Sequence, residues 1–287
     1  MSQELTIRPM TRGEVDLLVD WAAEEGWNPG LNDAEIFWNT DPEAFVAALK
    51  DKELIGGGAI TSYDGRYGFM GFFIVRPEFR HRGYGNYLWH IRRDKMLARL
   101  CPGSTVGLDG VFDMQSYYAK GGFSFSHRNL RFVCRPSSRV KTLEGNVVPL
   151  CQVPFDHLNQ YDRACFPACR GKFLQGWIAQ PEALSLGYLK DSRLEGYGVM
   201  RRCRKGFKIG PLFANDRQVA KSLCDQLLVH AAGEEVFLDV PENNPAAMAL
   251  ARAYGMEEIF GCARMYLGPK PKIMHNRVFG VTTFELG

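Results

Sequence analysis

The 287-residue sequence contains no run of about eighteen apolar residues, which excludes an ordinary membrane-spanning helix. It also lacks an excess of either charge, since 35 Lys and Arg stand against 32 Asp and Glu, for a formal net charge of +3 at pH 7. No segment is dense enough in basic residues to form an electrostatic groove for DNA. The short pairs Arg92-Arg93 and Arg201-Arg202 are more typical of solvated helix or strand faces. We therefore expect no membrane and no nucleic acid among its partners.

The N-terminus and the cysteines exclude two further classes. Met1-Ser2-Gln3-Glu4 is polar and acidic, so it does not resemble a signal peptide. The eight cysteines are scattered, and the pair Cys165 and Cys169 has neither a second pair nor histidine partners at the spacing of a zinc site. Reduced thiols in a cytoplasm and no bound metal are the simplest expectation.

What the sequence does contain is a globular composition, with 46% hydrophobic and 23% charged residues. Such a chain buries a sizeable core, and its length suits about two ordinary domains or one large one. The first half alternates helical and strand patterns. We expect a capped helix after residues 11–14, and a second helix that begins at Asp41-Pro42 with Phe45 and Leu49 on one face. A hairpin of residues 54–63 and 67–75 follows. The remaining elements are a helix from 84 to about 100, a strand at 105–108, a short helix at 114–120 and a strand at 123–135.

The second half repeats the later part of this order. A hairpin of residues 196–204 and 207–213 is followed by a helix at 217–232, a strand at 236–240, a helix at 245–254 and a strand at 262–267. The shared order predicts an internal duplication. Pro136-Ser137-Ser138-Arg139 is polar and contains proline, so it is the best boundary and gives domains 1–136 and 140–287.

A glycine-containing loop joins a predicted strand to the long helix of the first half. Arg80-His81-Arg82-Gly83-Tyr84-Gly85 follows residues 72–77 and precedes the helical pattern. Free N–H groups at a helix N-terminus and a backbone without side chains suit a phosphate, and the arginines add positive charge. A lone Gly-x-Gly is also a common tight turn. The third glycine of a dinucleotide-binding loop and the Gly-Lys-Ser/Thr of a P-loop are both missing, so neither class is expected.

A second block, Tyr118-Ala119-Lys120-Gly121-Gly122-Phe123, follows later in the chain. Together the two blocks resemble the GCN5-related N-acetyltransferases, with signatures Arg/Gln-x-x-Gly-x-Gly/Ala and Tyr-x-Lys-x-Gly-Phe, most strongly over residues 5–135. The strings Ile209-Gly210-Pro211-Leu212 and Leu238-Asp239-Val240-Pro241 make the chain look like bacterial tandem acetyltransferases with a YitH/HolE-type C-terminal half. The resemblance implies an α/β fold of two tandem domains, each a mixed, mostly antiparallel twisted sheet flanked by helices. It also implies acetyl-CoA as co-substrate and no metal.

The resemblance implies roles for individual residues. The acceptor amine would attack the thioester directly, and Tyr118 would be the general acid that protonates the departing thiolate. The alternative for Tyr118 is a partly buried aromatic residue on a short helix. The implied cofactor-binding residues are Phe73, Ile74, Val75, Arg80, His81, Arg82, Gly83, Tyr84, Gly85 and Asn86.

The acceptor pocket is less well defined by the sequence. Its candidates are Glu25, Trp27, Asn28 and Asp109, although a carboxylate is often simply solvated and Trp27 is equally suited to packing. We expect a small-molecule amine as the acceptor. A protein N-terminal or lysine acetyltransferase and a non-catalytic acetyl-CoA sensor are the alternatives. The general base and the oligomeric state stay open.

The second half departs from the family pattern at three positions. Gln218, Ala220 and Ala251 stand where the first half has Gly83, Gly85 and Tyr118. A glutamine side chain would crowd the approach of a phosphate that glycine permits. We therefore expect a degenerate copy that no longer catalyses, with a ligand of its own as the alternative.

Overall fold

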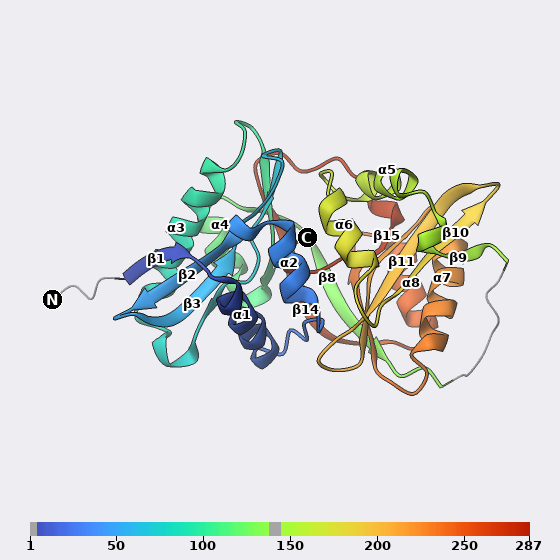
Figure 1. Ribbon diagram of the computed structural model, residues 1–287, viewed down its shortest axis with the longest axis horizontal. Helices are drawn as coiled ribbons and strands as arrows, with labels where there is room; N and C mark the ends of the chain where they lie inside the picture. Colours follow the sequence, from blue (N-terminus) through green and yellow to red (C-terminus); the bar gives the residue numbers. More distant parts are fainter. Residues whose placement is uncertain (1–4, 138–144) are drawn as a thin grey trace.

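The computed structural model describes residues 5–137 and 145–287 and shows two lobes, one from each half of the chain, joined through a shared β-sheet (Figure 1). Residues 138–144, which include Ser138 and Arg139 of the expected boundary, lie outside the described residues. The first half forms β1 (Leu5–Pro9), α1 (Arg12–Glu24), α2 (Asp33–Thr40), β2 (Phe45–Lys50), β3 (Glu53–Ala59), β4 (Thr61–Tyr63), β5 (Tyr67–Phe69), β6 (Ile74–Val75), α3 (Tyr84–Ala98), β7 (Thr105–Val111), α4 (Gln115–Lys120) and β8 (Ser124–Cys134).

The second half adds helices on both sides of its strands. It forms β9 (Val147–Pro149), α5 (Phe155–Cys165), α6 (Gly171–Ile178), β10 (Leu184–Lys190), β11 (Arg193–Arg202), β12 (Phe207–Ala214), α7 (Arg217–His230), β13 (Val236–Pro241), α8 (Pro245–Ala253), β14 (Glu257–Leu267) and β15 (Val278–Gly280). The expected α/β fold of two tandem sheet-and-helix units is confirmed.

The first helix forms where its capping residues predict. The Thr11 side chain accepts a hydrogen bond from the Glu14 N–H, and the Glu14 carboxylate accepts one from the Thr11 N–H. This capping box satisfies two backbone donors that a helix end otherwise leaves unpaired. The apolar face buries Val15, Leu18, Val19 and Ala22.

The helix expected after Asp41-Pro42 is wrong. Residues Pro42–Ala44 make only a short 3-10 turn, and β2 follows, antiparallel to both β1 and β3. Phe45 and Leu49 therefore lie on a strand whose first four residues are all buried. A short apolar run fits a buried strand as well as a helix, and pairing on both edges decides the outcome.

The two halves exchange strands. β8, from the first half, pairs with β13 of the second, and β14, from the second half, pairs with β7 of the first. β14 and β8 also pair with each other, so the large sheet runs without a break in the order β4-β5-β7-β14-β8-β13-β12-β11-β10-β9. A cut at the boundary proposed from the sequence would leave each half without one of its inner strands.

The first lobe contains an opening between two strands. β4 and β5 form the expected hairpin, and β5 runs parallel to β7. The chain then leaves β7, and β6 pairs instead with β3 in the separate four-stranded sheet. Residues 70–73 make this crossing, with Phe72 at φ 44°. The space between β6 and β7 is thus open to a ligand.

In the second lobe two neighbouring strands also separate, but a third strand fills the space between them. β12 pairs in parallel with β13 through Phe207–Ile209 and then separates from it. β15 occupies the gap, because it pairs with β12 at Leu212 and Phe213 and the Val281 N–H donates to the Asp239 carbonyl of β13. The chain's own strand lies where the first lobe is open.

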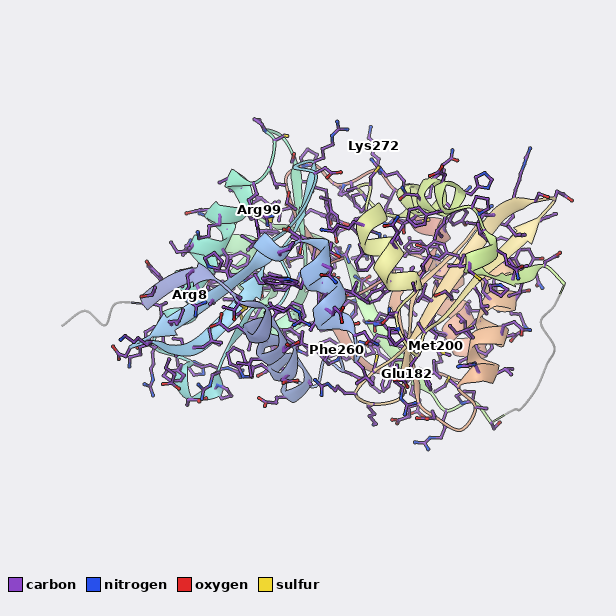
Figure 2. The ribbon with its side chains drawn as sticks, in the orientation of Figure 1. Arg8, Arg99, Glu182, Met200, Phe260 and Lys272 are labelled. Atoms are coloured by element: carbon purple, nitrogen blue, oxygen red, sulfur yellow. The ribbon has the colours of Figure 1, made fainter. Side chains whose placement is uncertain are left out.

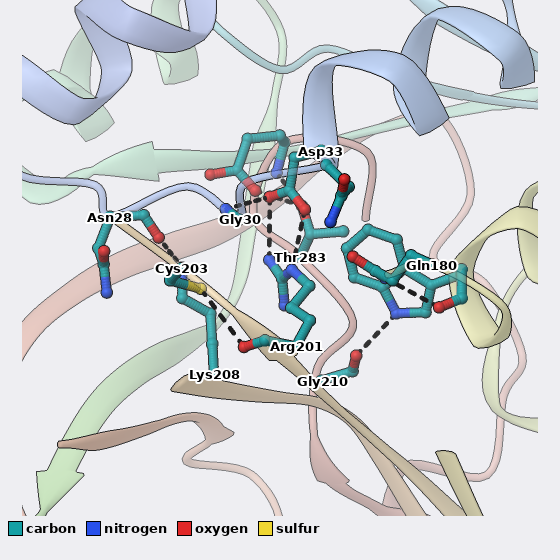
Figure 3. Close-up of polar contacts among 12 residues, drawn as sticks. Asn28, Gly30, Asp33, Gln180, Arg201, Cys203, Lys208, Gly210 and Thr283 are labelled. Carbon is teal, nitrogen blue, oxygen red and sulfur yellow. Dashed lines mark hydrogen bonds and ion pairs between the residues drawn. The ribbon is translucent and has the colours of Figure 1, made fainter. Parts of the chain in front are cut away.

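The lobes meet through α2 and α6. The Phe37 ring stacks on Trp177 with centroids 6.0 Å apart, and the Trp177 indole donates to the Gly210 carbonyl. Next to them, Arg201 of β11 forms an ion pair with Asp33 at 2.9 Å, with both side chains inaccessible to solvent (Figure 3). The expectation that the Arg201-Arg202 pair is solvated is therefore wrong for Arg201, which crosses the interface instead.

Candidate functional site

A cavity of about 430 Å³ occupies the opening between β6 and β7 and extends toward the second lobe. Phe260, on β14, lies between the lobes at this end (Figure 2). The lining residues are Glu25, Trp27, residues 70–75, Arg80, His81, Gly85, Asn86, Trp89, Arg92, residues 108–111, Met114, Tyr117, Tyr118, Phe260, Cys262, Phe284 and Glu285.

One end of the cavity is the N-terminus of α3. Gly83 is the N-cap residue in the left-handed region, with φ 84°, and no atom lies within 4 Å of the place where its Cβ would stand. At Gly85 a Cβ would meet only Val75 and Phe73 side-chain atoms, at 3.7 and 3.8 Å. The first-turn N–H groups of a helix lack intrahelical acceptors, so this open, side-chain-free end suits a phosphate.

The basic residues of the loop differ in their placement. The Arg80 Nε donates to the Val75 carbonyl at 2.7 Å, and its Nη2 is ion-paired with Glu25. Arg80 thereby ties the loop both to β6 and to the end of α1. Arg82 is exposed, and its guanidinium lies 5.9 Å from the Phe79 ring.

Seven of the ten predicted cofactor residues line the cavity. They are Phe73, Ile74, Val75, Arg80, His81, Gly85 and Asn86, whereas Arg82, Gly83 and Tyr84 stand beside it. Asn86 is held by Tyr117, whose hydroxyl donates to the Asn86 Oδ1 at 2.8 Å. The assignment of these residues to a cofactor stays a prediction.

Tyr118 lies on α4 at the inner wall of the cavity. Its ring packs 4.9 Å from Trp89, and it fills the space over Gly110 of β7, where any Cβ would overlap the ring. Burial raises the pKa of the Tyr118 phenol well above its ordinary value, and nearby Arg92 offsets this in part. The phenol is therefore protonated at neutral pH, as an acid must be.

Arg92 is a buried cation that sequence reasoning placed on a solvated face. Its side chain is 0% exposed, and its Nη2 donates to the carbonyls of Ala59 and Gly71 at 2.6 Å each. Its Nε and Nη1 have no hydrogen-bond partner among the described residues. Burial lowers the pKa of Arg92 to about 10. The residue follows Leu88 at helical spacing on the buried face, and that spacing was the signal that could have identified it.

The four acceptor candidates divide into two groups. Glu25 and Trp27 line the cavity. Asn28 instead bonds through its side chain to the backbone of Lys205, in the second half. Asp109 lines the cavity, but its carboxylate is buried and accepts two hydrogen bonds from Arg264, at 2.7 and 2.6 Å. This pairing favours a structural role for the Asp109 side chain.

The sequence predicts the second half as a wall of the acceptor pocket, but it does not name the residues that form this wall. Phe260 and Cys262 arrive on the exchanged strand β14, and Phe284 and Glu285 on the segment after β15. Nothing local in the sequence marks these residues, because their position depends on the exchange of strands.

Two general features of the described residues bear on function. Within residues 5–137 and 145–287, no helix is long and apolar enough to cross a membrane. Over the same ranges, no three His, Cys, Asp or Glu side chains gather where they could hold a metal ion.

Two family models match the chain, one in each half. The model described as acetyltransferase (GNAT) family matches residues 14–123, and the model described as acetyltransferase (GNAT) domain matches residues 158–280. Among curated proteins, a holothin acyltransferase from Pseudoalteromonas sp. is 28% identical over 290 residues, which cover 99% of this chain and 95% of the relative. An acetyltransferase from Yersinia enterocolitica is 37% identical over 76 residues, 26% of this chain and 53% of its own.

Solved structures share the fold along the whole chain. A putative acetyltransferase from Pyrococcus horikoshii superposes with a TM-score of 0.84 at 23% identity, covering 100% of this chain and 97% of its own. A tandem GNAT protein from the clavulanic acid biosynthesis pathway gives a TM-score of 0.64 at 15% identity, covering 93% and 100%. The two-lobed arrangement is thus found in both.

Proposed function

Because the chain belongs to the GNAT superfamily and is a tandem-domain acyltransferase, we propose that it transfers an acetyl group from acetyl-CoA to the primary amine of a small molecule. The amine attacks the thioester directly while both substrates are bound. The observation that supports this most is the cavity itself, because it places an open helix N-terminus, an unpaired strand edge and a buried phenol around one space.

The residues around the cavity fit the parts of acetyl-CoA. The α3 N-terminus, with Gly83 and Gly85, would take the pyrophosphate, and His81 and Asn86 stand at the same end. β6 is paired with β3 on one edge only, so its other edge offers main-chain groups to the amide-containing pantetheine arm.

Tyr118 supplies the proton that the leaving thiolate takes. Burial alone would make this phenol a poor acid, because the phenolate left behind would be a buried anion. Arg92 faces it with two unpaired N–H-bearing nitrogens and a positive charge that no carboxylate balances among the described residues. The guanidinium therefore stabilises the phenolate as it forms.

The shape of the site supports a small acceptor. The cavity is bounded on the far side by the second lobe, through Phe260 and Phe284, so an amine must fit between the lobes. The relative that matches along nearly the full chain is named a holothin acyltransferase, and holothin is accordingly the first acceptor to test.

The test is a screen of the purified chain with acetyl-CoA and a mixed amine library, read by release of free thiol. We expect release with at least one small amine, and loss of release in the Gly83→Glu variant. If acetyl-CoA binds and no amine, protein lysine or protein N-terminus is acetylated, the protein is a sensor and the proposed transfer is wrong.

A further inference from the structure

The segment 281–287 leaves the second lobe and crosses to the first. It begins directly after β15, where the Val281 N–H donates to the Asp239 carbonyl, and it reaches Tyr63, whose hydroxyl donates to the Leu286 carbonyl at 2.8 Å. Figure 1 shows this end of the chain between the two lobes. On the way, Phe284 and Glu285 enter the lining of the cavity.

Glu285 is held at the point where the first lobe opens. Its backbone lies directly over Gly71, where any Cβ would overlap the Glu285 carbonyl. Gly71 is in the crossing between β5 and β6, and its own carbonyl accepts from Arg92. The absence of a side chain at Gly71 thus brings a residue of the second half into the cavity.

The Glu285 carboxylate is buried without a cation. Its residue is 3% exposed, and its Oε2 accepts from the Thr283 hydroxyl, which also accepts from the Glu285 N–H. Among the described residues, no Lys, Arg or His forms an ion pair with it. The other buried carboxylates contrast with it, since each is paired with an arginine: Asp33, Asp41, Asp162 and Asp239.

The two cations near Glu285 each have a carboxylate of their own. Arg131 and Arg201 lie close enough to interact with Glu285, but each forms its ion pair with an aspartate, and the Arg201 Nη1 has no hydrogen-bond partner among the described residues. Cys262 also lies near Glu285. A buried carboxylate without an ion pair of its own costs free energy, which a ligand cation would offset.

The walls around this carboxylate are apolar. Trp27, Phe260 and Phe284 line the same end of the cavity, and the Phe260 and Phe284 rings lie 6.3 Å apart. Such walls suit an apolar or aromatic body. The Arg131 guanidinium already lies over the Phe260 and Phe284 rings, 5.5 and 5.0 Å from their centroids.

We propose that Glu285 binds the protonated amine of the acceptor and removes its proton, and that the acceptors are primary amines carried on an apolar or aromatic body. This rests on the proposed acetyl transfer. The ammonium gives one proton to the Glu285 carboxylate, and the freed nitrogen forms a bond to the thioester carbon as the carbon–sulfur bond breaks. The thiolate takes a proton from Tyr118, the phenolate regains one from the amide nitrogen, and Glu285 releases its proton to solvent.

Two assays on the full chain test the proposal through Glu285→Gln, which keeps the size and removes the charge. In the first, calorimetry without acetyl-CoA compares 2-phenylethylamine with uncharged 2-phenylethanol. We expect the variant to lose at least tenfold in affinity for the amine and little for the alcohol. Glu258→Gln, an exposed glutamate on β14, is the matched control and should behave as the unsubstituted chain.

The second assay is turnover as a function of pH. In Glu285→Gln we expect kcat/KM for the amine to fall roughly 10²- to 10³-fold, within the range for loss of a general base, with unchanged acetyl-CoA affinity. The remaining rate should rise about tenfold per pH unit up to the pKa of the amine, because only free amine then reacts. The charged and titratable neighbours are the same in both proteins, so the difference between the two pH profiles reports on Glu285. These neighbours are Arg131, Arg201, Asp33, Asp239 and Cys262.

The outcomes separate the two proposals. If the wild-type chain acetylates amines and Glu285→Gln has the same kcat/KM and the same pH profile, the role of Glu285 is wrong and the proposed transfer stands. A wild-type chain without turnover removes the transfer. In that case equal affinity of both proteins for 2-phenylethylamine also overturns the amine site, whereas a loss in the variant supports it.

Discussion

Tyr118 shows how one residue's surroundings fix its chemistry. The phenol is buried against Trp89 and β7, and its raised pKa keeps it protonated across the neutral range. A group that must be protonated to act, and whose pKa lies above 10, is not titrated away near neutral pH. A fall in the rate as the pH rises through the neutral range must then come from another group.

Replacing Tyr118 by phenylalanine removes the proton and little of the packing. We expect turnover to fall by roughly ten- to a thousand-fold, in the range for loss of a general acid, with cofactor affinity nearly unchanged. Steady-state kinetics and calorimetry check both parts. The control is Tyr87→Phe, which removes a phenol hydroxyl from an exposed position on α3 and should keep full activity. Full activity in Tyr118→Phe would assign the proton to water or another residue.

Gly83 offers a second prediction with a matched control. Gly83→Glu places an anion at the open N-terminus of α3, so we expect acetyl-CoA binding to be abolished in calorimetry. The matched control is Gly103→Glu, because Gly103 has nearly the same backbone, with φ 81° against 84°, and equally open space around it. Both substitutions therefore carry a similar strain of about 1–2 kcal/mol from the left-handed backbone. Equal cofactor binding by the two variants would contradict the assignment of the loop.

At the scale of elements, β15 decides how the second lobe differs from the first. It fills the divergence of β12 and β13, and the Asp216 carboxylate caps α7 by accepting from the Val219 N–H at 2.9 Å. In the second lobe a strand and a carboxylate thus take the places that a pantetheine arm and a phosphate would need.

We therefore expect titration to find one acetyl-CoA per chain. The physical reason is that binding in the second lobe would require β15 to leave a paired position and an anion to approach Asp216. Calorimetry measures the stoichiometry directly. Two equivalent sites, or one site that survives Gly83→Glu, would show that the second lobe binds the cofactor.

The strand β8 carries a pH-sensitive residue. Burial lowers the pKa of His127 to about 3, aided by Arg264 and by His275, whose ring lies 5.6 Å away. An unfolded histidine titrates near 6.5, so between about pH 6.5 and 3 the unfolded chain holds a proton that the folded chain does not. The contribution of His127 to stability is complete above pH 6.5 and is lost as the pH falls through that window.

The measurement is urea unfolding at pH 7 and pH 5. The loss of free energy of unfolding between the two should be smaller by about 2 kcal/mol in His127→Gln than in the unsubstituted chain, from about 1.4 kcal/mol per pH unit. His90→Gln, at an exposed position on α3, should leave the loss unchanged. The same loss in all three proteins would mean that His127 is not the titrating group.

How far the sequence predicts the structure depends on how local the determining interactions are. The α1 capping box and the turn at Asp64-Gly65 depend on neighbours in sequence, and both form as expected. β2 was expected to be a helix, because its pairing partners lie in other segments. Arg92 and Glu285 also escaped prediction. An arginine pair looks solvated until packing buries one member, and no spacing rule links residue 285 to a loop near residue 71.

For the whole molecule, the exchange of β8 and β14 makes each lobe depend on the other. Without β14, β7 would be paired on one edge only, and without β8 the same holds for β13. An inner strand of the sheet would then become an exposed edge. Buried ion pairs also cross between the halves, as Arg131 with Asp239 and Arg264 with Asp109.

We expect residues 1–136 and residues 140–287 to fail to fold when each is produced alone. Removing one member of a buried ion pair costs about 3–5 kcal/mol, and each fragment loses such partners as well as an inner strand. Circular dichroism with thermal unfolding, on each fragment and on the full chain as control, measures the outcome. A cooperative transition in either fragment would show that its sheet closes without the exchanged strand.

The strand exchange also delays the pairing of β7 during synthesis on the ribosome. β7 ends at Val111, but its partner β14 ends at Leu267, so the nascent first lobe has an unpaired inner edge while the intervening residues are made. At 5–20 residues per second that interval lasts roughly 10–30 s. During it the emerged chain exposes a strand edge and the apolar walls of its future cavity. A chaperone that binds extended apolar segments would therefore meet this chain after β7 has emerged and release it once β14 has paired.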